Sequence, residues 1–233
     1  MPQVFCCKIN QMTRSNNIAE KYELEQTPIS INGKRLDLYR VKNIDPIIND
    51  LANKGEEDIS HFPFWVKVWE SSIVLASHLI NMDIEKGKEI LEIGAGMGVA
   101  GLFLGLSGHK VTITDYDDDA LELLRMNVKH NQLDNVSVRK LDWNFPDLTG
   151  KFDIICGSEL VYNKKHIKPI IKLFQDYLKT DGTIFMSHDV TRMTMINFIE
   201  TVLGQFKIEN VVKSLKGNED IYKIVIHSLS LKG

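Results

Sequence analysis

Lys88-Glu89-Ile90-Leu91-Glu92-Ile93-Gly94-Ala95-Gly96-Met97-Gly98-Val99-Ala100-Gly101 is the stretch that decides the fold of this chain. An apolar run ends in glycines at three alternate positions, and apolar residues at helical spacing follow directly. The pattern predicts a strand, a glycine loop and a helix. Such a loop lets a ligand approach the backbone where a Cβ would clash, and it presents free N–H groups at the start of the helix. We therefore expect a ligand site at this loop.

The loop contains one literal match to the dinucleotide-binding pattern GxGxxG, formed by Gly96, Gly98 and Gly101. If the strand ends at Ile93, however, the first loop glycine is Gly94 and the third position of the pattern is Val99, so the dinucleotide register is wrong. Glu92 needs a cationic or hydrogen-bonding neighbour, because burying an unpaired carboxylate is costly. A turn that only packs the helix on the strand is the structural alternative.

The composition suits a globular chain with one domain and an extension. The 233 residues are 43% hydrophobic and 25% charged. The net charge of −3 gives no electrostatic argument for a nucleic acid or membrane partner. No secretory signal and no apolar run long enough to span a membrane is visible. The three cysteines have no CxxC or histidine spacing, which argues against zinc and disulfides, so we expect no metal and a cytoplasmic protein.

The front section, roughly residues 1–60, is too small for a core of its own and should pack on the domain at 61–233. We expect a short helix near Ile18 to Leu24 and a β-hairpin that turns at Asn32-Gly33, a dipeptide that tolerates positive φ. A brief helix should open at Asp45-Pro46, run through Leu51 and end at Gly55.

From residue 88 onward the chain alternates between strands and helices. The expected strands are 88–93, 110–114, 136–141, 152–156, 183–187 (after a turn at Asp181-Gly182), 206–215 and 221–229. The expected helices between them are the one after the glycine loop, 120–131, 164–178 and 191–203, and a further helix at 71–82 precedes the first strand. This alternation predicts a Rossmann-like α/β fold, an open and mostly parallel sheet of seven strands with helices on both faces and an antiparallel C-terminal edge.

Ligands of an open α/β sheet bind beyond the carboxyl ends of its strands. Asp115 follows the second strand, 21 residues after Gly94, where a carboxylate can accept bonds from both hydroxyls of a ribose. A helix cap is the alternative, although Asp117, Asp118 or Asp119 is the better cap. Asp142 and Trp143 follow the third strand and suit an adenine amino group and ring.

The fourth strand is followed by Glu159 and Tyr162, which should face the reactive end of the ligand. A helix cap and a core position are their alternatives. Upstream, residues 61–72 hold four aromatic residues. Core filling explains Phe62, Phe64 and Trp65 as well as a site does, whereas Trp69 beside the charged Glu70 favours a site.

These motifs in this order resemble class I S-adenosylmethionine-dependent methyltransferases, and specifically the methyltransferase-16 family, which includes many protein-lysine methyltransferases. The resemblance covers roughly residues 60–190. Its elements are Val68-Trp69-Glu70-Ser71-Ser72, Leu91 to Gly98, Thr114-Asp115, Asn127 to Asn131, Leu141-Asp142-Trp143-Asn144, Phe152-Asp153-Ile154-Ile155 and Glu159-Leu160-Val161-Tyr162.

The resemblance implies a role for each site residue. S-adenosylmethionine would be the cofactor, and Trp69 would lie against it. Glu92 would organise the loop of Gly94, Gly96 and Gly98 and the methionine amino group. Asp115 would bind the ribose, the adenine would be surrounded by Tyr116, Asp142 and Trp143, and the backbone of Ser158 would contact the methionine part. Glu159 and Tyr162 would be catalytic. The family's usual acid at position 159 is Asp, so the reach of this acid differs.

The resemblance implies transfer of a methyl group to a nucleophile, most simply a protein lysine. Such an amine is neutral in only about one molecule in a thousand at pH 7.4, a penalty of roughly 4 kcal/mol. An apolar pocket lowers its pKa and an anionic Glu159 raises it, so we assign Glu159 to orienting the acceptor. The alternatives are a small-molecule acceptor, an NAD-dependent dehydrogenase, for which His166 and His188 offer no recognisable motif, and a binding module without catalysis.

Overall fold

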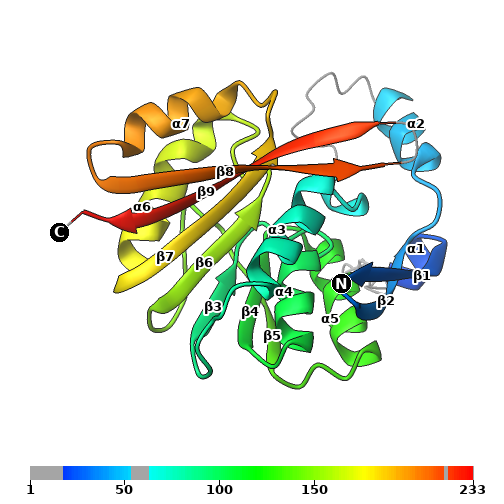
Figure 1. Ribbon diagram of the computed structural model, residues 1–233. Coiled ribbons are helices and arrows are strands. Elements are labelled where there is room, and N and C mark those ends of the chain that lie inside the picture. The colour runs from blue at the N-terminus through cyan, green and yellow to red at the C-terminus, as the bar shows by residue number, and fades with distance from the viewer. Residues whose placement is uncertain (1–17, 54–62, 218–219, 233) are drawn as a thin grey trace, which may run out of the picture.

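The strand before the glycine loop, β3 (Glu89–Glu92), lies inside a sheet of seven strands (Figure 1). The computed structural model describes residues 18–53, 63–217 and 220–232. The order across the sheet is β5 (Val136–Lys140), β4 (Lys110–Asp115), β3, β6 (Phe152–Ser158), β7 (Leu178–Asp189), β9 (Ile221–Leu231) and β8 (Phe206–Lys216). Pairing is parallel from β5 to β7, and β9 is antiparallel to both of its neighbours. The predicted fold class is confirmed.

Alternate residues of the central strands enter two separate cores, as the two-residue period of a strand requires. Ile90 of β3 packs in one core with α3 (Glu70–Ile80), α4 (Val99–Leu106) and α5 (Asp118–His130). Its neighbour Leu91 packs in the other with α6 (Ile167–Tyr177) and α7 (Thr194–Val202). The helices therefore cover both faces of the sheet, which leaves the edge beyond the carboxyl ends of β3, β4 and β6 for a ligand.

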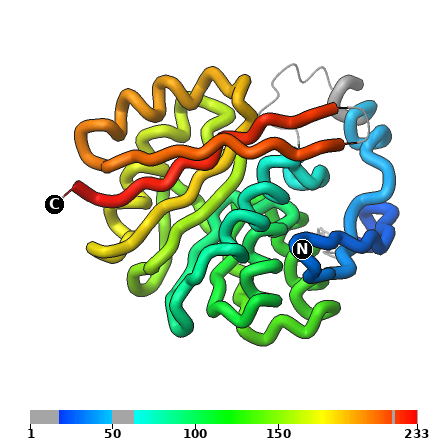
Figure 2. The backbone as a smooth tube through the Cα atoms, viewed as in Figure 1, coloured from blue at the N-terminus to red at the C-terminus, as the bar shows by residue number. Residues whose placement is uncertain are grey.

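The N-terminal hairpin consists of β1 (Leu24–Ile31) and β2 (Lys34–Val41), and Figure 2 shows it on the side of the molecule opposite the C-terminus. Asn32 and Gly33 have φ values of 50° and 78°, as the predicted turn requires. Leu36 and Leu38 are buried in the core that α4 and α5 share. The hairpin is thus attached to the α5 side of the sheet.

Asn127 of α5 and Asn131, the C-cap of the same helix, bind the backbone of β2. The side-chain amide of Asn127 accepts from the N–H of Tyr39 at 2.7 Å and donates to its carbonyl at 3.1 Å. Asn131 makes the same pair of bonds with Asp37 at 3.1 and 3.0 Å. Residues 37 and 39 point the same way along a strand, so the two amides satisfy the edge of β2 as a neighbouring strand would.

Several predicted boundaries shift. The first helix, α1 (Ile18–Lys21), is one turn long because Leu24 already pairs in β1, and α2 spans Asp45–Asn53, with Gly55 outside the described residues. β6 continues to Ser158. The helix predicted to reach Leu178 ends at Tyr177, and β7 begins at Leu178. The turn expected at residues 181–182 is an irregularity inside β7, which leaves residues 179–182 out of the ladder with β6.

The remaining helical segments are short. A 3-10 turn, η2 (Phe64–Val66), precedes α3, and another, η3 (Lys164–His166), precedes α6. The helix expected from residue 191 begins at Thr194. Across the described ranges, no helix combines the length and the apolar character that crossing a bilayer requires.

Candidate active site

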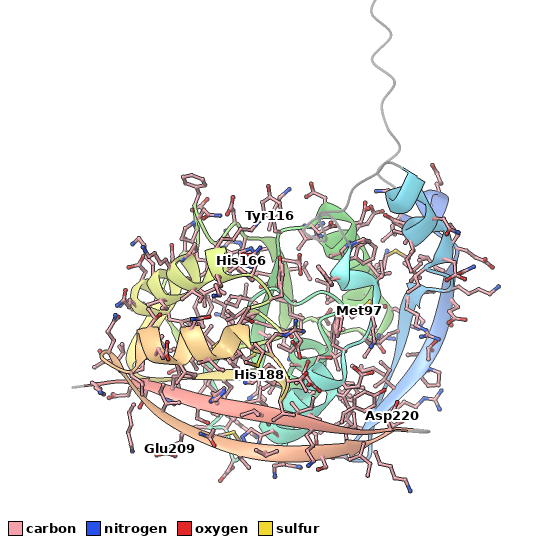
Figure 3. The ribbon with its side chains drawn as sticks, turned by 90° about the horizontal axis from the view of Figure 1, so that it is seen from above. Met97, Tyr116, His166, His188, Glu209 and Asp220 are labelled. Atoms are coloured by element: carbon pink, nitrogen blue, oxygen red, sulfur yellow. The ribbon has the colours of Figure 1, made fainter. Side chains whose placement is uncertain are left out.

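A cavity of about 670 Å³ lies at the carboxyl ends of β3, β4, β5 and β6. This volume is within the range of small-molecule and cofactor sites. All the residues predicted for the site line the cavity except Glu92 and Gly98, which lie behind the glycine loop: the lining includes Trp69, Gly94, Gly96, Asp115, Tyr116, Asp142, Trp143, Ser158, Glu159 and Tyr162. Figure 3 labels three of the lining residues, Met97, Tyr116 and His166.

The glycine loop needs its glycines for both conformation and space. Gly94, Gly96 and Gly98 have φ values of 56°, 53° and 66°, in the left-handed region that other residues seldom adopt. A Cβ on Gly94 would lie 2.8 Å from a ring carbon of Trp143. A Cβ on Gly98 would lie 2.4 Å from Leu124 of α5. The loop is therefore pressed between the cavity on one side and α5 on the other.

Glu92 is 1% exposed and supports the loop from behind. Its Oε2 accepts the backbone N–H of Gly101 at 2.8 Å, in the first turn of α4, where free N–H groups favour an acid. Burial raises the pKa of the carboxyl to about 8, although the N–H groups of Gly101 and Ala100 oppose the shift. Gly101 has to be glycine here, because a Cβ would lie 2.5 Å from this Oε2.

Asp115 joins the end of β4 to the glycine loop. Its Oδ2 accepts from the N–H of Gly96 at 2.7 Å, and its Oδ1 accepts from Tyr116 at 2.7 Å and Asp117 at 3.0 Å. Burial nevertheless raises the pKa of this carboxyl. Asp117 caps α5 by accepting from residues 119 and 120, so Asp115 is not the helix cap. The expectation that one of the following aspartates caps the helix is confirmed.

Asp142 and Trp143 lie on the next loop, after β5. Asp142 Oδ1 accepts from the backbone N–H of Asn144 at 2.8 Å and from its side-chain amide at 3.0 Å. Tyr116 is 65% exposed at the mouth of the cavity, with Lys140 Nζ 5.4 Å from its ring centroid. These side chains surround the end of the cavity nearest β4 and β5.

Four rings follow one another around the other end, and we call them the aromatic arc: Trp69, Phe64, Tyr162 and His166. Centroids of successive rings are 6.2, 5.4 and 4.5 Å apart, and the ring of His166 lies 5.3 Å from that of Trp143 at the first end. Tyr162 is 39% exposed and lines the cavity, so it is not a core residue. Of the aromatics that core filling also explained, Phe64 and Trp65 both line the cavity, although Trp65 is only 4% exposed, and Phe62 lies outside the described residues.

Glu159 follows β6 in the left-handed region, with φ of 52°. Its Oε1 accepts the backbone N–H of Asp189 at 2.8 Å. Its Oε2 accepts from Arg192 Nε at 2.9 Å and lies 2.7 Å from Arg192 Nη2. The cap of η3 is Asn163, so Glu159 is not a helix cap. The carboxylate enters the cavity already paired with a guanidinium.

Sequence reasoning missed Arg192, His166 and Lys165, which also line the cavity. The predicted site residues follow the first four strands of the sheet in chain order, whereas Arg192 lies beyond the fifth, β7. Asp189 ends β7 and Arg192 follows three residues later, so the strand-end rule of ligand binding, extended to β7, finds both partners of Glu159. His166 follows β6 as Tyr162 does, four residues further along and at the end of η3.

The comparisons identify the family. A family model described as lysine methyltransferase matches residues 52–205. The chain belongs to this lysine methyltransferase family. Protein N-lysine methyltransferase METTL21A of Xenopus tropicalis is 31% identical over 150 residues, which cover 62% of this chain and 69% of that protein. A histidine protein methyltransferase 1 homolog of Dictyostelium discoideum is 34% identical over 128 residues, which cover 52% of this chain and 41% of that protein.

Solved structures share the architecture of this lysine methyltransferase family member. The ribosomal protein L11 methylase of Lactobacillus delbrueckii subsp. bulgaricus superposes with a TM-score of 0.56 at 20% identity, covering 72% of this chain and 81% of that one. At this identity the likeness shows the fold. Family and fold together make the chain a class I S-adenosylmethionine-dependent methyltransferase.

Proposed function

We propose that the cavity binds S-adenosylmethionine and that the chain transfers its methyl group to the side-chain amine of a protein lysine. The observation that carries the proposal is one continuous cavity that joins the glycine loop and Asp115 at one end to the aromatic arc and Glu159 at the other. The first end suits a nucleoside, and the second suits a cationic or alkyl group. The lysine named for the METTL21A relative supports the choice of acceptor.

The residues at the nucleoside end fit the cofactor. Gly94 and Gly96 give the backbone a surface without Cβ atoms, and Asp115 Oδ2 accepts one protein N–H, which leaves it a second lone pair for a ribose hydroxyl. Asp142, Trp143 and Tyr116 would hold the adenine, while Trp69 and Ser158 would contact the methionine part. Glu92 and Gly98 would act indirectly by fixing the loop. The cofactor supplies a methyl group already activated by a sulfonium.

The residues at the other end would prepare the acceptor. A lysine must lose its proton before it can attack, and desolvation among the rings of the aromatic arc lowers its pKa. Glu159 would orient the amine, and Arg192 offsets the charge of Glu159 so that the carboxylate raises the amine's pKa less. Tyr162 would form the wall of the pocket and donate a hydrogen bond. The chain therefore contributes alignment and a partly dry, charge-balanced pocket.

The decisive experiment is incubation of the purified chain with methyl-labelled S-adenosylmethionine and a cell extract of the source organism, followed by mass spectrometry of the labelled sites. We expect label on lysine side chains. Label on histidine, the residue named for the Dictyostelium relative, or on a small molecule would overturn the lysine assignment. Heat-inactivated chain is the control for labelling by enzymes of the extract.

Two further expectations stand as proposals. Residues 1–60 would be an extension on a methyltransferase domain at 61–233, which is supported by a family match from residue 52 and by the packing of the hairpin on α5. A cytoplasmic location is supported by cysteines that show no disulfide or zinc spacing.

A further inference from the structure

Each protein partner of Glu159 is followed by an exposed apolar residue. Asp189 precedes Val190, which is 49% exposed, and Arg192 precedes Met193, which is 71% exposed. Ile196 lies one helical turn after Met193, on the same face of α7, and is 52% exposed. We call Val190, Met193 and Ile196 the apolar ridge. The ridge begins beside Arg192, which lines the cavity and binds Glu159.

The opposite face of α7 already fills the core of the protein. Met195 and Phe198 are 4% and 0% exposed there. The apolar ridge is therefore a second apolar face on the same helix. Single exposed apolar residues are common, but three together at the mouth of a site mark a contact surface.

Three exposed lysines, Lys164, Lys165 and Lys168, stand next to the apolar ridge. Lys164 and Lys165 belong to η3, which packs against α7, and Thr194 of α7 donates a hydrogen bond to the carbonyl of Val161 just before η3. Lys165 also lines the cavity. Within the parts of the chain that the structure describes, none of the three forms an ion pair. They form a cationic cluster beside the acceptor end of the cavity.

The acids of the cavity do not cancel this cluster. Asp115, Asp117 and Asp142 line the nucleoside end. Glu159 is at the acceptor end, but Arg192 already offsets its charge. The rim around the acceptor end therefore has an excess of positive charge, which repels a lysine surrounded by basic residues and attracts one surrounded by acids.

We propose that the apolar ridge and the cationic cluster together dock the acceptor protein through a surface that carries acidic and apolar residues around the methylated lysine. The proposal rests on the proposed function and names its partner by chemistry. The cluster would bind acidic side chains of the acceptor protein, and the ridge next to it would bury an apolar side chain. The phosphates of a nucleic acid could pair with the lysines but would not bury the apolar ridge. A protein surface can match both the cationic cluster and the apolar ridge.

The test begins with the acceptor. The lysine labelled most strongly in a nuclease-treated extract is mapped, and its protein is made in recombinant form. We expect acidic and apolar residues next to that lysine. A lysine flanked by basic residues overturns this inference while leaving the proposed function intact, and label on nucleic acid in an untreated extract also overturns it. Label on no lysine at all overturns the proposed function instead.

Variants then test the rim itself. Lys164→Glu/Lys168→Glu, which leaves the cavity-lining Lys165 in place, should raise the KM for the recombinant acceptor by about tenfold at low salt, with little change in kcat or in cofactor affinity. The matched control, Lys86→Glu/Lys151→Glu, reverses two exposed lysines, one before β3 and one before β6, and it should behave as wild type. Because the attraction is screened, added salt should raise the wild-type KM and not that of the rim variant.

A second pair of variants tests the apolar ridge. Met193→Ser/Ile196→Ser should also raise the acceptor KM, whereas Leu203→Ser, which changes an equally exposed residue just beyond the far end of α7, should not. Calorimetric titration with S-adenosylmethionine and a melting curve show whether each variant is folded. An unchanged acceptor KM in both folded rim variants would overturn the docking surface.

Discussion

At the scale of single residues, Glu92 is a side chain whose ionisation costs free energy in the folded protein. Its carboxyl is buried behind the glycine loop, and its pKa is raised to about 8 against an ordinary 4.5. The folded state therefore keeps a proton that the unfolded state loses above pH 4.5. Stability falls as pH rises between these two values, because the folded state binds more protons there. The acid is retained at this cost because its Oε2 holds the start of α4.

Glu92→Gln is the test of this account. Glutamine keeps the size and an oxygen for the Gly101 N–H, and it removes the titration. We expect little change in stability near pH 4.5 and a gain that grows to the order of a few kcal/mol by pH 8. Urea unfolding at several pH values measures it. A gain that does not depend on pH would mean that the carboxyl titrates normally in the folded protein.

Asp115 carries the second prediction at this scale. Asp115→Asn retains an oxygen for two of the three N–H groups but cannot accept from Gly96, and it has no charge for a ribose. We expect cofactor binding to weaken by about 1.5 to 3 kcal/mol, the range for hydrogen bonds to a charged group. Isothermal titration decides it. Asp118→Asn, which changes an exposed aspartate outside the cavity lining, is the control and should leave affinity nearly unchanged.

At the scale of elements, Glu159 and Arg192 join the loop after β6 to the connection between β7 and α7. The two carboxylate oxygens of Glu159 reach the end of β7 at Asp189 and the connection after it at Arg192 together.

Arg192→Met removes the guanidinium and keeps a long side chain. With Glu159 no longer offset, the pKa of an acceptor amine should rise, so methylation at pH 7.4 should fall by about tenfold or more and recover at higher pH. The pH profile of kcat/KM measures this. A loss that is equal at every pH would assign Arg192 a structural role only, and Arg192→Lys, which restores the charge, should bring the profile part of the way back.

Asn127 and the hairpin give a second prediction for elements. Asn127 is fully buried, and Asn127→Ala would leave the N–H and carbonyl of Tyr39 without their partner. We expect a loss of about 2 to 4 kcal/mol and faster hydrogen exchange over residues 34–41. Asn131→Ala, at a less buried position, should cost less. Equal exchange in wild type and Asn127→Ala would show that the apolar contacts of Leu36 and Leu38 hold the hairpin alone.

The sequence was informative where local chemistry decides the structure. The glycine loop, the turn at Asn32-Gly33 and the strand ends at Asp115 and Glu159 follow from rules that act over a few residues. Tertiary pairing decided the rest. Leu178 reads as the end of an apolar helix, yet it pairs with Phe152. Glu159 and Arg192 are 33 residues apart, so the strand-end rule places both at the same edge of the sheet but the fold decides that they pair.

At the scale of the whole molecule, the sheet separates two cores and brings every loop of the cavity to one edge. Ile90 and Leu91 belong to different cores, and the neighbouring strand β6 likewise contributes Ile154 to one core and Ile155 to the other. The glycine loop, the loops after β4 and β5, and Glu159 therefore sit on a rigid base. A ligand that spans these loops links elements from both halves of the sheet, so its binding should be visible in global unfolding.

The last prediction is a thermal shift. S-adenosylmethionine and S-adenosylhomocysteine should each raise the melting temperature, because a ligand at one hundred times its dissociation constant adds about 2.7 kcal/mol, which corresponds to roughly 5 to 10 °C for a chain of this size. NAD should give no comparable shift, since the glycines are out of register for a dinucleotide and Trp143 packs against Gly94 at the base of the cavity. Differential scanning fluorimetry over a range of ligand concentrations measures all three. The shift should shrink in Asp115→Asn, which ties it to this cavity. A shift with NAD and none with either methionine-derived ligand would contradict the cofactor assignment and favour a dehydrogenase.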